Sequence, residues 1–241
     1  MSDPVVEASD VVKFLGQGAA RVQALRGVSL SLRGGELVML MGPSGSGKTT
    51  LLSVLGCMLS PSLGSVRVCG RSTTGLEPEQ LTALRRDHIG FVFQSYHLFP
   101  TLTALDNVRI ALDVRGDYSR RVVERAKEAL ATVGLSHKRR SYPLELSSGE
   151  QQRVAIARAI IGDAAAILAD EPTAALDSEN GHAIMSILAG IARQGTRGVL
   201  VVTHDPRILP FADRIIHIED GRIVRKNGNG GALPLTARDG Q

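Results

Sequence analysis

A run of glycine, serine, lysine and threonine at residues 42–50, GPSGSGKTT, has the composition and spacing of a loop that binds nucleotide phosphates. An apolar run of strand character, residues 36–41, precedes it, and helix-forming residues resume at Lys48. Its glycines allow successive N–H groups to point at phosphate oxygens, at the positive end of the following helix. The predicted nucleotide contacts are Gly42, Ser44, Gly45, Ser46, Gly47, Lys48, Thr49 and Thr50.

Two side chains of this loop have specific chemical roles. The Lys48 ammonium is predicted to reach the β- and γ-phosphates, and the Thr49 hydroxyl to bind Mg²⁺. The alternative is a glycine-rich turn with no ligand. It is disfavoured because every position of the motif matches, and because strand, loop and helix follow in the required order.

Two further apolar runs end in side chains that are suited to catalysis. Residues 164–169 are followed by Asp170 and Glu171, and residues 199–203 by His204. Ligands of open α/β sheets bind at the carboxyl edge of the strands. We therefore expect Asp170 to complete the Mg²⁺ shell through water, Glu171 to act as general base on the attacking water, and His204 to hydrogen-bond the γ-phosphate. Each alone is compatible with an ordinary turn residue, and the phosphate loop favours the catalytic interpretation.

Length and pattern predict one α/β domain with smaller lobes. A chain of 241 residues can bury a substantial core, and its strands alternate with helices. The N-terminal stretch and residues 65–69 have the pattern of an antiparallel lobe, and residues 96–140 have helical periodicity. We expect the domain at 5–225, a helical subdomain at about 96–160, and a disordered tail at 226–241, which lacks apolar periodicity.

Composition narrows the classes of partner. The net charge of +4 comes mostly from arginine, and a scattered solvated surface explains it better than binding to acidic lipid. No basic run carries interleaved aromatics, so no nucleic-acid partner is expected. Cys57 and Cys69 are interpreted as small hydrophobic residues rather than metal ligands. The chain shows neither a membrane-spanning apolar run nor an export signal, which predicts a cytoplasmic protein.

Taken in order, these segments and three others resemble the ABC ATPase family over nearly the whole chain. Gln94, which follows the apolar residues 91–93, is similar to the glutamine that in this family binds Mg²⁺ and senses the membrane partner. Residues 146–150, LSSGE, resemble the family's signature segment, and residues 174–177, AALD, resemble the loop that crosses between subunits. The resemblance implies a P-loop NTPase fold, with a RecA-like core, an antiparallel β lobe and a helical lobe.

The resemblance also implies an ATPase that uses ATP and Mg²⁺ and forms a homodimer on ATP binding. Lys48, Thr49, Gln94 and Asp170 of one subunit would hold each ATP together with the signature of the other subunit. A paralogous partner is the alternative to a second copy. The family's contacts across the dimer carry over to Ser147, Ser148, Gly149, Glu150 and Asp177.

Two positions depart from the family pattern. The signature usually has glycine where this chain has Ser148, and the crossing loop usually begins with serine where this chain has Ala174. Ser147 and Gly149 keep the hydroxyl and the amide that meet the opposing γ-phosphate in the family. Ser148 adds a side chain at a close backbone approach, and we therefore expect slightly weakened closure of the dimer.

An aromatic side chain upstream of the phosphate loop stacks on adenine in this family. Phe14 is the preferred candidate, with Leu15 as the alternative because the frame is uncertain by one residue. Stacking of a base on an aromatic ring contributes about 1 to 3 kcal/mol, so a leucine there would weaken adenine recognition without abolishing it. Packing of Phe14 in a strand is the ordinary alternative.

Two kinds of machine fit such a motor. One is the ATPase subunit of a transporter, docked on a separate membrane protein through residues 96–100; the other is a soluble or signalling ABC ATPase that transports nothing. The chain lacks a tandem ATPase, a coiled-coil insertion and a cysteine cluster, which favours the first. Residues 88–94 and 98–107 resemble the MacB/LolD-type branch, and residues 169–178 and 203–209 its DevA-like exporters. This implies an FtsX/MacB-like permease, often with a periplasmic adaptor, at the inner membrane.

Overall fold

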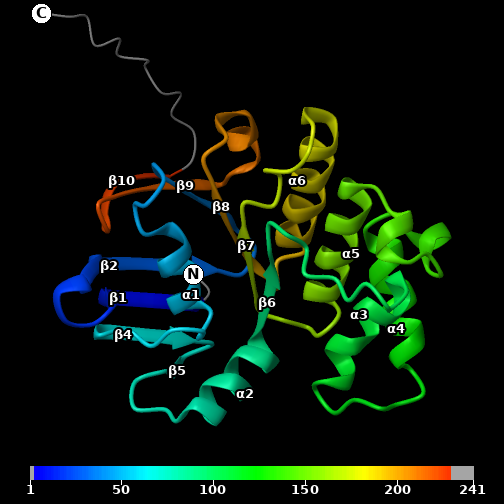
Figure 1. The fold of residues 1–241 in the computed structure, drawn as a ribbon, viewed down its shortest axis with the longest axis horizontal. Helices are drawn as coiled ribbons and strands as arrows, with labels where there is room; N and C mark the ends of the chain where they lie inside the picture. Colours follow the sequence, from blue (N-terminus) through cyan, green and yellow to red (C-terminus); the bar gives the residue numbers. More distant parts are fainter. Residues whose placement is uncertain (1–2, 229–241) are drawn as a thin grey trace, which may run out of the picture.

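The computed structural model describes residues 3–228, and its centre is a six-stranded sheet. Five neighbouring strands run parallel, and the edge strand β10 is antiparallel to β9. In spatial order the strands are β10 (Arg222–Gly228), β9 (Arg214–Glu219), β3 (Leu37–Met41), β8 (Gly198–Thr203), β7 (Ala166–Asp170) and β6 (Ile89–Val92). Figure 1 shows this sheet running through the middle of the molecule.

An antiparallel sheet of four strands forms a second layer beside it (Figure 1). Its strands, in spatial order, are β2 (Val22–Arg33), β1 (Pro4–Leu15), β4 (Leu63–Val68) and β5 (Arg71–Ser72). Helix α1 (Lys48–Leu55) buries its apolar residues in the same core as the inner faces of both sheets. The predicted antiparallel lobe is therefore present, and it packs against the helix that follows the phosphate loop.

The central strands β3, β7 and β8 are apolar along nearly their whole length, as expected for strands that are buried on both faces. On β3, Leu37 and Met39 enter the core on the helical side, whereas Val38 and Leu40 enter the core shared with the second sheet. Strands β7 and β8 alternate in the same way. Two apolar cores thus pack against the two faces of these strands, up to the ends where the polar side chains begin.

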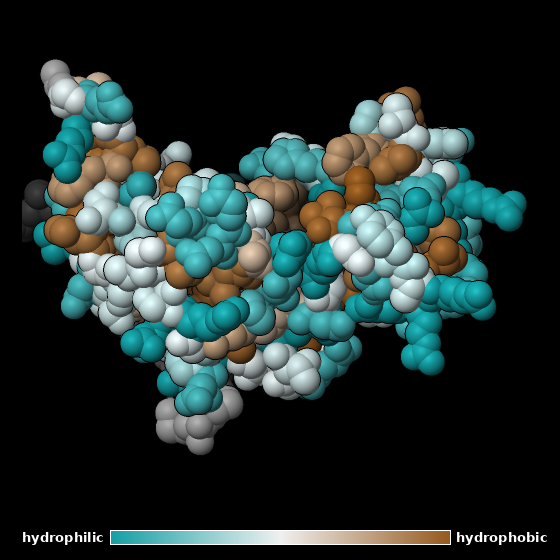
Figure 2. Space-filling view, turned by 90° about the horizontal axis from the view of Figure 1, so that it is seen from below, coloured by the Kyte–Doolittle hydropathy of each residue, from teal (hydrophilic) through white to brown (hydrophobic). Residues whose placement is uncertain are grey.

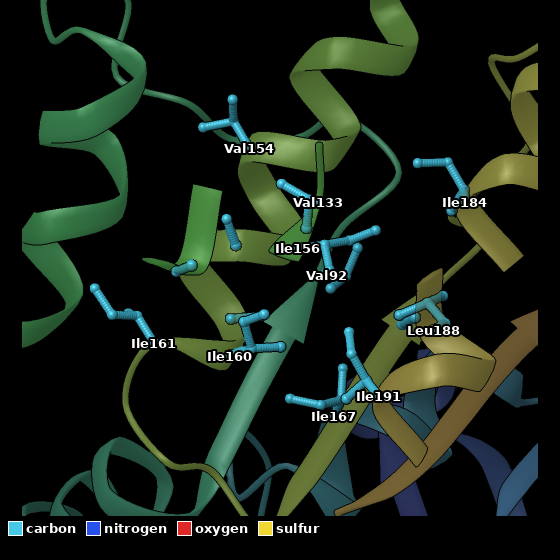
Figure 3. Close-up of a cluster of buried hydrophobic side chains, with 14 of the residues drawn as sticks. Val92, Val133, Val154, Ile156, Ile160, Ile161, Ile167, Ile184, Leu188 and Ile191 are labelled. Carbon is cyan, nitrogen blue, oxygen red and sulfur yellow. The ribbon is translucent and has the colours of Figure 1, made fainter. Parts of the chain in front are cut away.

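Helices cover the other face of the central sheet and extend into a helical lobe. They are α3 (Ala104–Asp113), α4 (Val122–Thr132), α5 (Ser148–Ile160) and α6 (Ser178–Arg193), while α2 (Pro78–His88) precedes β6. Figure 3 shows Ile156 and Ile160 of α5 and Leu188 and Ile191 of α6 meeting Ile167 of β7 in one cluster. Short 3₁₀ helices lie at Gly18–Ala20, Ser136–Lys138, Pro143–Glu145 and Pro206–Phe211.

The fold class is confirmed, with one boundary moved. Strand β10 continues through residues 226–228, which had been predicted as tail, because their backbone pairs with β9. The rest of the predicted tail lies outside the described residues. Seen from below, the molecule has two lobes with a hollow in the outline between them (Figure 2). Within residues 3–228, no helix combines the length and apolarity needed to cross a membrane.

Gly56 offers a test of how tightly α1 is packed. It caps the C-terminus of α1, and a Cβ there would collide with the end of the Phe91 ring on β6. We expect Gly56→Ala to lower the free energy of unfolding by about 1 to 3 kcal/mol, as for overpacked cores. The matched control is Gly190→Ala in α6, where a Cβ meets nothing within 4 Å and alanine favours the helix. Equal unfolding midpoints in urea for the two variants would contradict the prediction.

Candidate nucleotide-binding site

A cavity of about 770 Å³ opens where the carboxyl ends of β3, β7 and β8 meet the antiparallel sheet. Most of the predicted site residues line it: Ser44, Gly45, Gly47, Lys48, Thr49, Thr50, Gln94, Asp170, Glu171 and His204. They come from four separate segments of the chain. The topology therefore assembles the phosphate loop, both carboxylates and the histidine around one space of a size suited to a small ligand.

The phosphate loop joins β3 to α1 and depends on glycine for two different reasons. Gly47, the residue before α1, has φ +102°, and a Cβ on it would lie 2.7 Å from the Ala24 carbonyl oxygen. Gly42 has an ordinary φ; there the close approach of the Ile218 carbonyl leaves no room for a side chain. Gly42 is thus required by lack of space and not by an unusual backbone angle. Gly42 and Ser46 support the loop without lining the cavity.

Lys48 begins α1 and lies over the loop. Its ammonium donates hydrogen bonds to the carbonyl oxygens of Gly42 and Pro43, both at 2.8 Å. The charge is therefore held at the mouth of the phosphate loop, beside the N-terminal end of a helix. Both features favour an anionic group in this part of the cavity.

Asp170, Thr49 and Gln94 all line the cavity and carry side-chain oxygen atoms. Burial raises the pKa of Asp170, while a hydrogen bond from the Thr49 side chain and the charge of Lys48 oppose that rise. The Oδ1 atom of Asp170 is buried and has no hydrogen-bond partner among the described residues. A carboxylate oxygen, a hydroxyl and an amide suit Mg²⁺, which is commonly held by one or two carboxylates together with substrate phosphates. These residues therefore fit the predicted metal.

Gln94 follows β6 in a loop that is tied to α5. Arg158 of α5 donates a hydrogen bond of 2.6 Å to the carbonyl oxygen of Tyr96, and another to that of His97. Both residues have positive φ, so the loop turns sharply just after Gln94. The position of Gln94 thus depends on the helix that begins at the signature segment.

Glu171 and His204 form a direct pair at the ends of β7 and β8. The Glu171 Oε1 atom lies 2.7 Å from His204 Nδ1. Glu171 has φ +47°, and its N–H donates to the Val202 carbonyl oxygen, so the turn after β7 directs the carboxylate toward the neighbouring strand end. When Nδ1 carries a proton and donates a hydrogen bond to the carboxylate, Nε2 stays available, and it can donate to a phosphate oxygen when it also carries a proton. The two residues can therefore act on one reacting group.

The apolar wall of the cavity answers the choice between Phe14 and Leu15. Leu15 lines the cavity together with its cross-strand partner Val22, whereas Phe14 is not among the lining residues. Successive side chains of a strand point to opposite faces. The Phe14 ring instead stacks with the Arg21 guanidinium, which lies 4.0 Å from the ring centroid. The preference for Phe14 is thus corrected in favour of Leu15.

None of the four predicted signature contacts lines this cavity. Ser147 instead caps α5: its Oγ accepts the Glu150 N–H, and the Glu150 carboxylate accepts the Ser147 N–H at 2.9 Å. Burial acts to raise the pKa of Glu150, but the Ser147 N–H and Lys138 outweigh it and lower the pKa. Ser148 is exposed and has no left-handed φ, so a side chain is tolerated there within one chain.

The signature lies against the first turn of α6. A Cβ on Gly149 would lie 2.8 Å from Oδ1 of Asn180. Asn180 in turn donates its backbone N–H and its side-chain amide to Asp177, at 2.9 and 2.7 Å, and the first of these bonds is the main reason that the pKa of Asp177 is lowered. Asp177 does not line the cavity. The structure thus groups Asp177 with the signature, away from the phosphate loop.

Comparison with known proteins identifies the family. The family model described as ABC transporter matches residues 25–174. The chain belongs to the ABC transporter family. Macrolide export ATP-binding/permease protein MacB of Escherichia coli K12 is 42% identical over 96% of the chain and 37% of its own length. The protein of the same name from Chromobacterium violaceum is 46% identical over 95% of the chain and 35% of its own length.

Solved structures agree with this assignment. A dimeric post-hydrolysis state of the ATP-binding cassette MJ0796, bound to ADP and Pi, superimposes with a TM-score of 0.85 at 42% identity. The match covers 94% of this chain and all of that one. The predicted ABC ATPase fold, the ATPase class and the ligands ATP and Mg²⁺ are thereby confirmed, as is the MacB branch. The chain spans little more than a third of the MacB relatives.

Several cavity residues were not predicted from the sequence. Asp220 and Gly221, in the turn between β9 and β10, line the site of this ABC protein, as do Gln23, Ala24 and Arg26 of β2. An Asp-Gly pair between apolar strands signals a hairpin turn. Nothing in the sequence indicates that this turn lies against the phosphate loop, because the contact depends on the pairing of β9 with β3 in the central sheet.

Proposed function

We propose that this chain is the ATPase subunit of an exporter, which dimerises around two Mg-ATP and drives a separate MacB-like permease. The proposal rests on the observation that the functional residues of one chain lie in two separate places. The phosphate loop, Asp170 and the Glu171–His204 pair line one cavity, whereas the signature and Asp177 lie outside it. A second copy that presents its signature to this cavity would complete the site, and the MJ0796 cassette is described as dimeric.

The residues of one subunit have distinct tasks in this proposal. Lys48 and the loop N–H groups bind the β- and γ-phosphates, and the adenine lies against Leu15 and Val22. Thr49, Gln94 and Asp170 hold Mg²⁺, which would neutralise charge on the phosphates. Glu171 accepts the proton of the attacking water, and His204, with a proton on both ring nitrogens, donates a hydrogen bond from Nε2 to the γ-phosphate. Loss of the γ-phosphate then removes the contact across the dimer, and the subunits separate.

The partner is proposed from the relatives. Their names join an ATP-binding part to a permease in one protein called MacB, and attribute macrolide export to it. We propose that the permease of this chain is a separate FtsX/MacB-like protein, which holds the chain at the inner face of the membrane. A periplasmic adaptor, a DevA-like role and export or extraction of lipids or lipoproteins belong to the same proposal.

The dimer is tested by size-exclusion chromatography with light scattering on Glu171→Gln, because slow hydrolysis would preserve the ATP-bound state. We expect a monomer without nucleotide and a dimer with Mg-ATP. Lys48→Ala with Mg-ATP is the matched control, and it should remain monomeric. A monomeric Glu171→Gln protein at an ATP concentration shown to saturate it would refute the sandwich.

The permease is tested by capture from native membranes. Tagged Glu171→Gln protein with Mg-ATP should retain an integral membrane protein that contains a MacB-like periplasmic domain, and Lys48→Ala should retain much less. Recovery of the chain without any integral membrane partner, from membranes in which a permease of this type is detected, would favour the alternative of an ATPase that does not transport.

Ser148 gives a prediction about the rate. We expect Ser148→Gly to raise the ATPase rate by about twofold, a barrier change of a few tenths of a kcal/mol, because the removed side chain stands at the approach between subunits. ATP affinity of the monomer and the unfolding midpoint should change little, since Ser148 is exposed and outside the cavity. A slower glycine variant would sink the idea that Ser148 hinders closure.

A further inference from the structure

The turn between β9 and β10 holds two parts of the nucleotide site together. The Gly221 N–H donates a hydrogen bond of 3.0 Å to the carbonyl oxygen of Ser46 in the phosphate loop. The Gly221 carbonyl oxygen accepts the N–H of Arg26 on β2 at 2.8 Å. One residue thus connects the phosphate loop to the strand that forms the other wall of the cavity.

The space around Gly221 leaves no room for a side chain. A Cβ on Gly221, where φ is +72°, would lie 2.6 Å from the Ala24 carbonyl oxygen. The same oxygen would lie 2.7 Å from a Cβ on Gly47, the residue before α1. The Ala24 carbonyl is therefore enclosed between two glycines from different segments. Any displacement of the turn is transmitted to Ser46, which is buried, and so to the N–H groups that follow it.

We propose that Gly221 is a positioning residue for nucleotide binding, which sets the phosphate loop against β2. The inference rests on the proposed function, in that ATP occupies the cavity. Gly221 makes none of the contacts of the Glu171–His204 pair, so its role concerns binding of the phosphates rather than activation of water. Substitution should accordingly affect ATP affinity and KM more than kcat.

A second hairpin of the same chain provides a matched control. Cys69 and Gly70 join β4 to β5 with φ of 48° and 76°, and Asp220 and Gly221 join β9 to β10 with φ of 44° and 72°. Both glycines occupy the second position of the two-residue turn. A Cβ on Gly70 meets nothing within 4 Å. Gly70→Ala therefore reports the backbone strain of such a turn alone, and Gly221→Ala reports the same strain together with displacement of the site.

The test measures ATP dissociation constants and steady-state kinetics of the full chain with Mg²⁺. We expect Gly221→Ala to weaken ATP affinity about tenfold or more, since small misplacements of a site have such effects. Gly70→Ala should change affinity less than about twofold, as surface substitutions do. The kcat of Gly221→Ala at saturating ATP should stay within about threefold of wild type. Equal affinities of the two variants, or a loss confined to kcat, would overturn the inference.

Hydrogen exchange of the wild-type protein provides a test that requires no variant to fold. ATP binding should slow exchange in peptides that span residues 219–222, because the Gly221 N–H bonds to the phosphate loop, and leave peptides that span 68–71 unchanged. Equal changes at both turns would overturn the inference. A wild-type chain that binds no ATP would refute the proposed function itself, which is a different result from bound ATP with no protection at 219–222.

Discussion

Replacement of Glu171 by Gln is expected to reduce ATP turnover by about 10² to 10⁴-fold, the range for loss of a general base. The amide has nearly the shape of the carboxylate but cannot accept the proton of the attacking water. Lys48, Thr49 and Asp170 are unchanged, so ATP should still bind. The measurement is phosphate release at saturating Mg-ATP, with ATP affinity measured in parallel.

The pairing with His204 makes this expectation specific. Glu171 holds a left-handed backbone conformation, which costs about 1 to 2 kcal/mol in a residue with a side chain, and its carboxylate meets His204 Nδ1 at 2.7 Å. Glutamine can keep this contact by accepting a hydrogen bond from Nδ1, and the orientation of the imidazole should therefore persist. The loss of turnover in Glu171→Gln would therefore report the missing proton transfer and not a displaced His204.

The control for this variant is Glu128→Gln, which neutralises an exposed carboxylate on α4 outside the cavity. It should hydrolyse ATP at the wild-type rate and show no dimer that persists after ATP addition. Turnover of Glu171→Gln within about threefold of wild type would show that another group accepts the proton, and the assignment would be wrong.

Much of this fold could be predicted because local signals agreed with one another. The strands β3, β7 and β8 are apolar at consecutive positions, which indicates burial on both faces, and functional segments follow all three at the same edge of the sheet: the phosphate loop after β3, Asp170 and Glu171 at the end of β7, and His204 after β8. The phosphate loop has a fixed pattern between a strand and a helix. Such features depend on residues that are neighbours in the sequence. The sequence was therefore enough to predict that the phosphate loop, Asp170, Glu171 and His204 belong to one site.

Other parts of the site depend on geometry that the sequence does not state. Phe14 and Leu15 are adjacent, and the face to which each points depends on the register of β1 with β2 and its irregularities. An error of one residue exchanges the two faces. The Glu171–His204 pair requires both the order of β7 and β8 and the turn at Glu171. The contact of Gly221 with Ser46 depends on β9 lying next to β3 in the central sheet, a strand order for which no local signal exists.

The two-part site makes a second large effect testable with mixtures of inactive chains. Lys48→Ala removes charge-assisted hydrogen bonds to phosphate, each worth about 1.5 to 3 kcal/mol, and Ser147→Ala removes the hydroxyl proposed to meet the γ-phosphate of the opposing subunit. We expect each variant alone to lose about 10²-fold or more of the wild-type ATPase rate. A mixture of the two should regain activity, because a mixed dimer joins an intact phosphate loop to an intact signature.

Two controls separate this complementation from simpler effects. Ser147 also caps α5, so its loss costs about 1 kcal/mol of stability. Thr103→Ala removes an equivalent cap on α3, where Thr103 Oγ1 accepts the Asp106 N–H at 3.2 Å, and should remain active. Mixing Lys48→Ala with Asp170→Asn should restore nothing, because both defects lie in the same half of the site.

The recovered rate depends on how many mixed dimers form. Random pairing gives about half mixed dimers, each with one intact and one doubly defective site, as two-fold symmetry requires. Dimer exchange measured with differently labelled chains fixes that fraction independently. Activity that rises and falls with the mixed fraction would show that ATP is shared between subunits. Absence of recovery, at a mixed fraction shown to be high, would have two explanations: each chain hydrolyses ATP without the partner's signature, or two intact sites are needed together. A dimer of one wild-type chain and one chain with both Lys48→Ala and Ser147→Ala distinguishes them. That dimer has no complete shared site, so it is active only if one chain suffices.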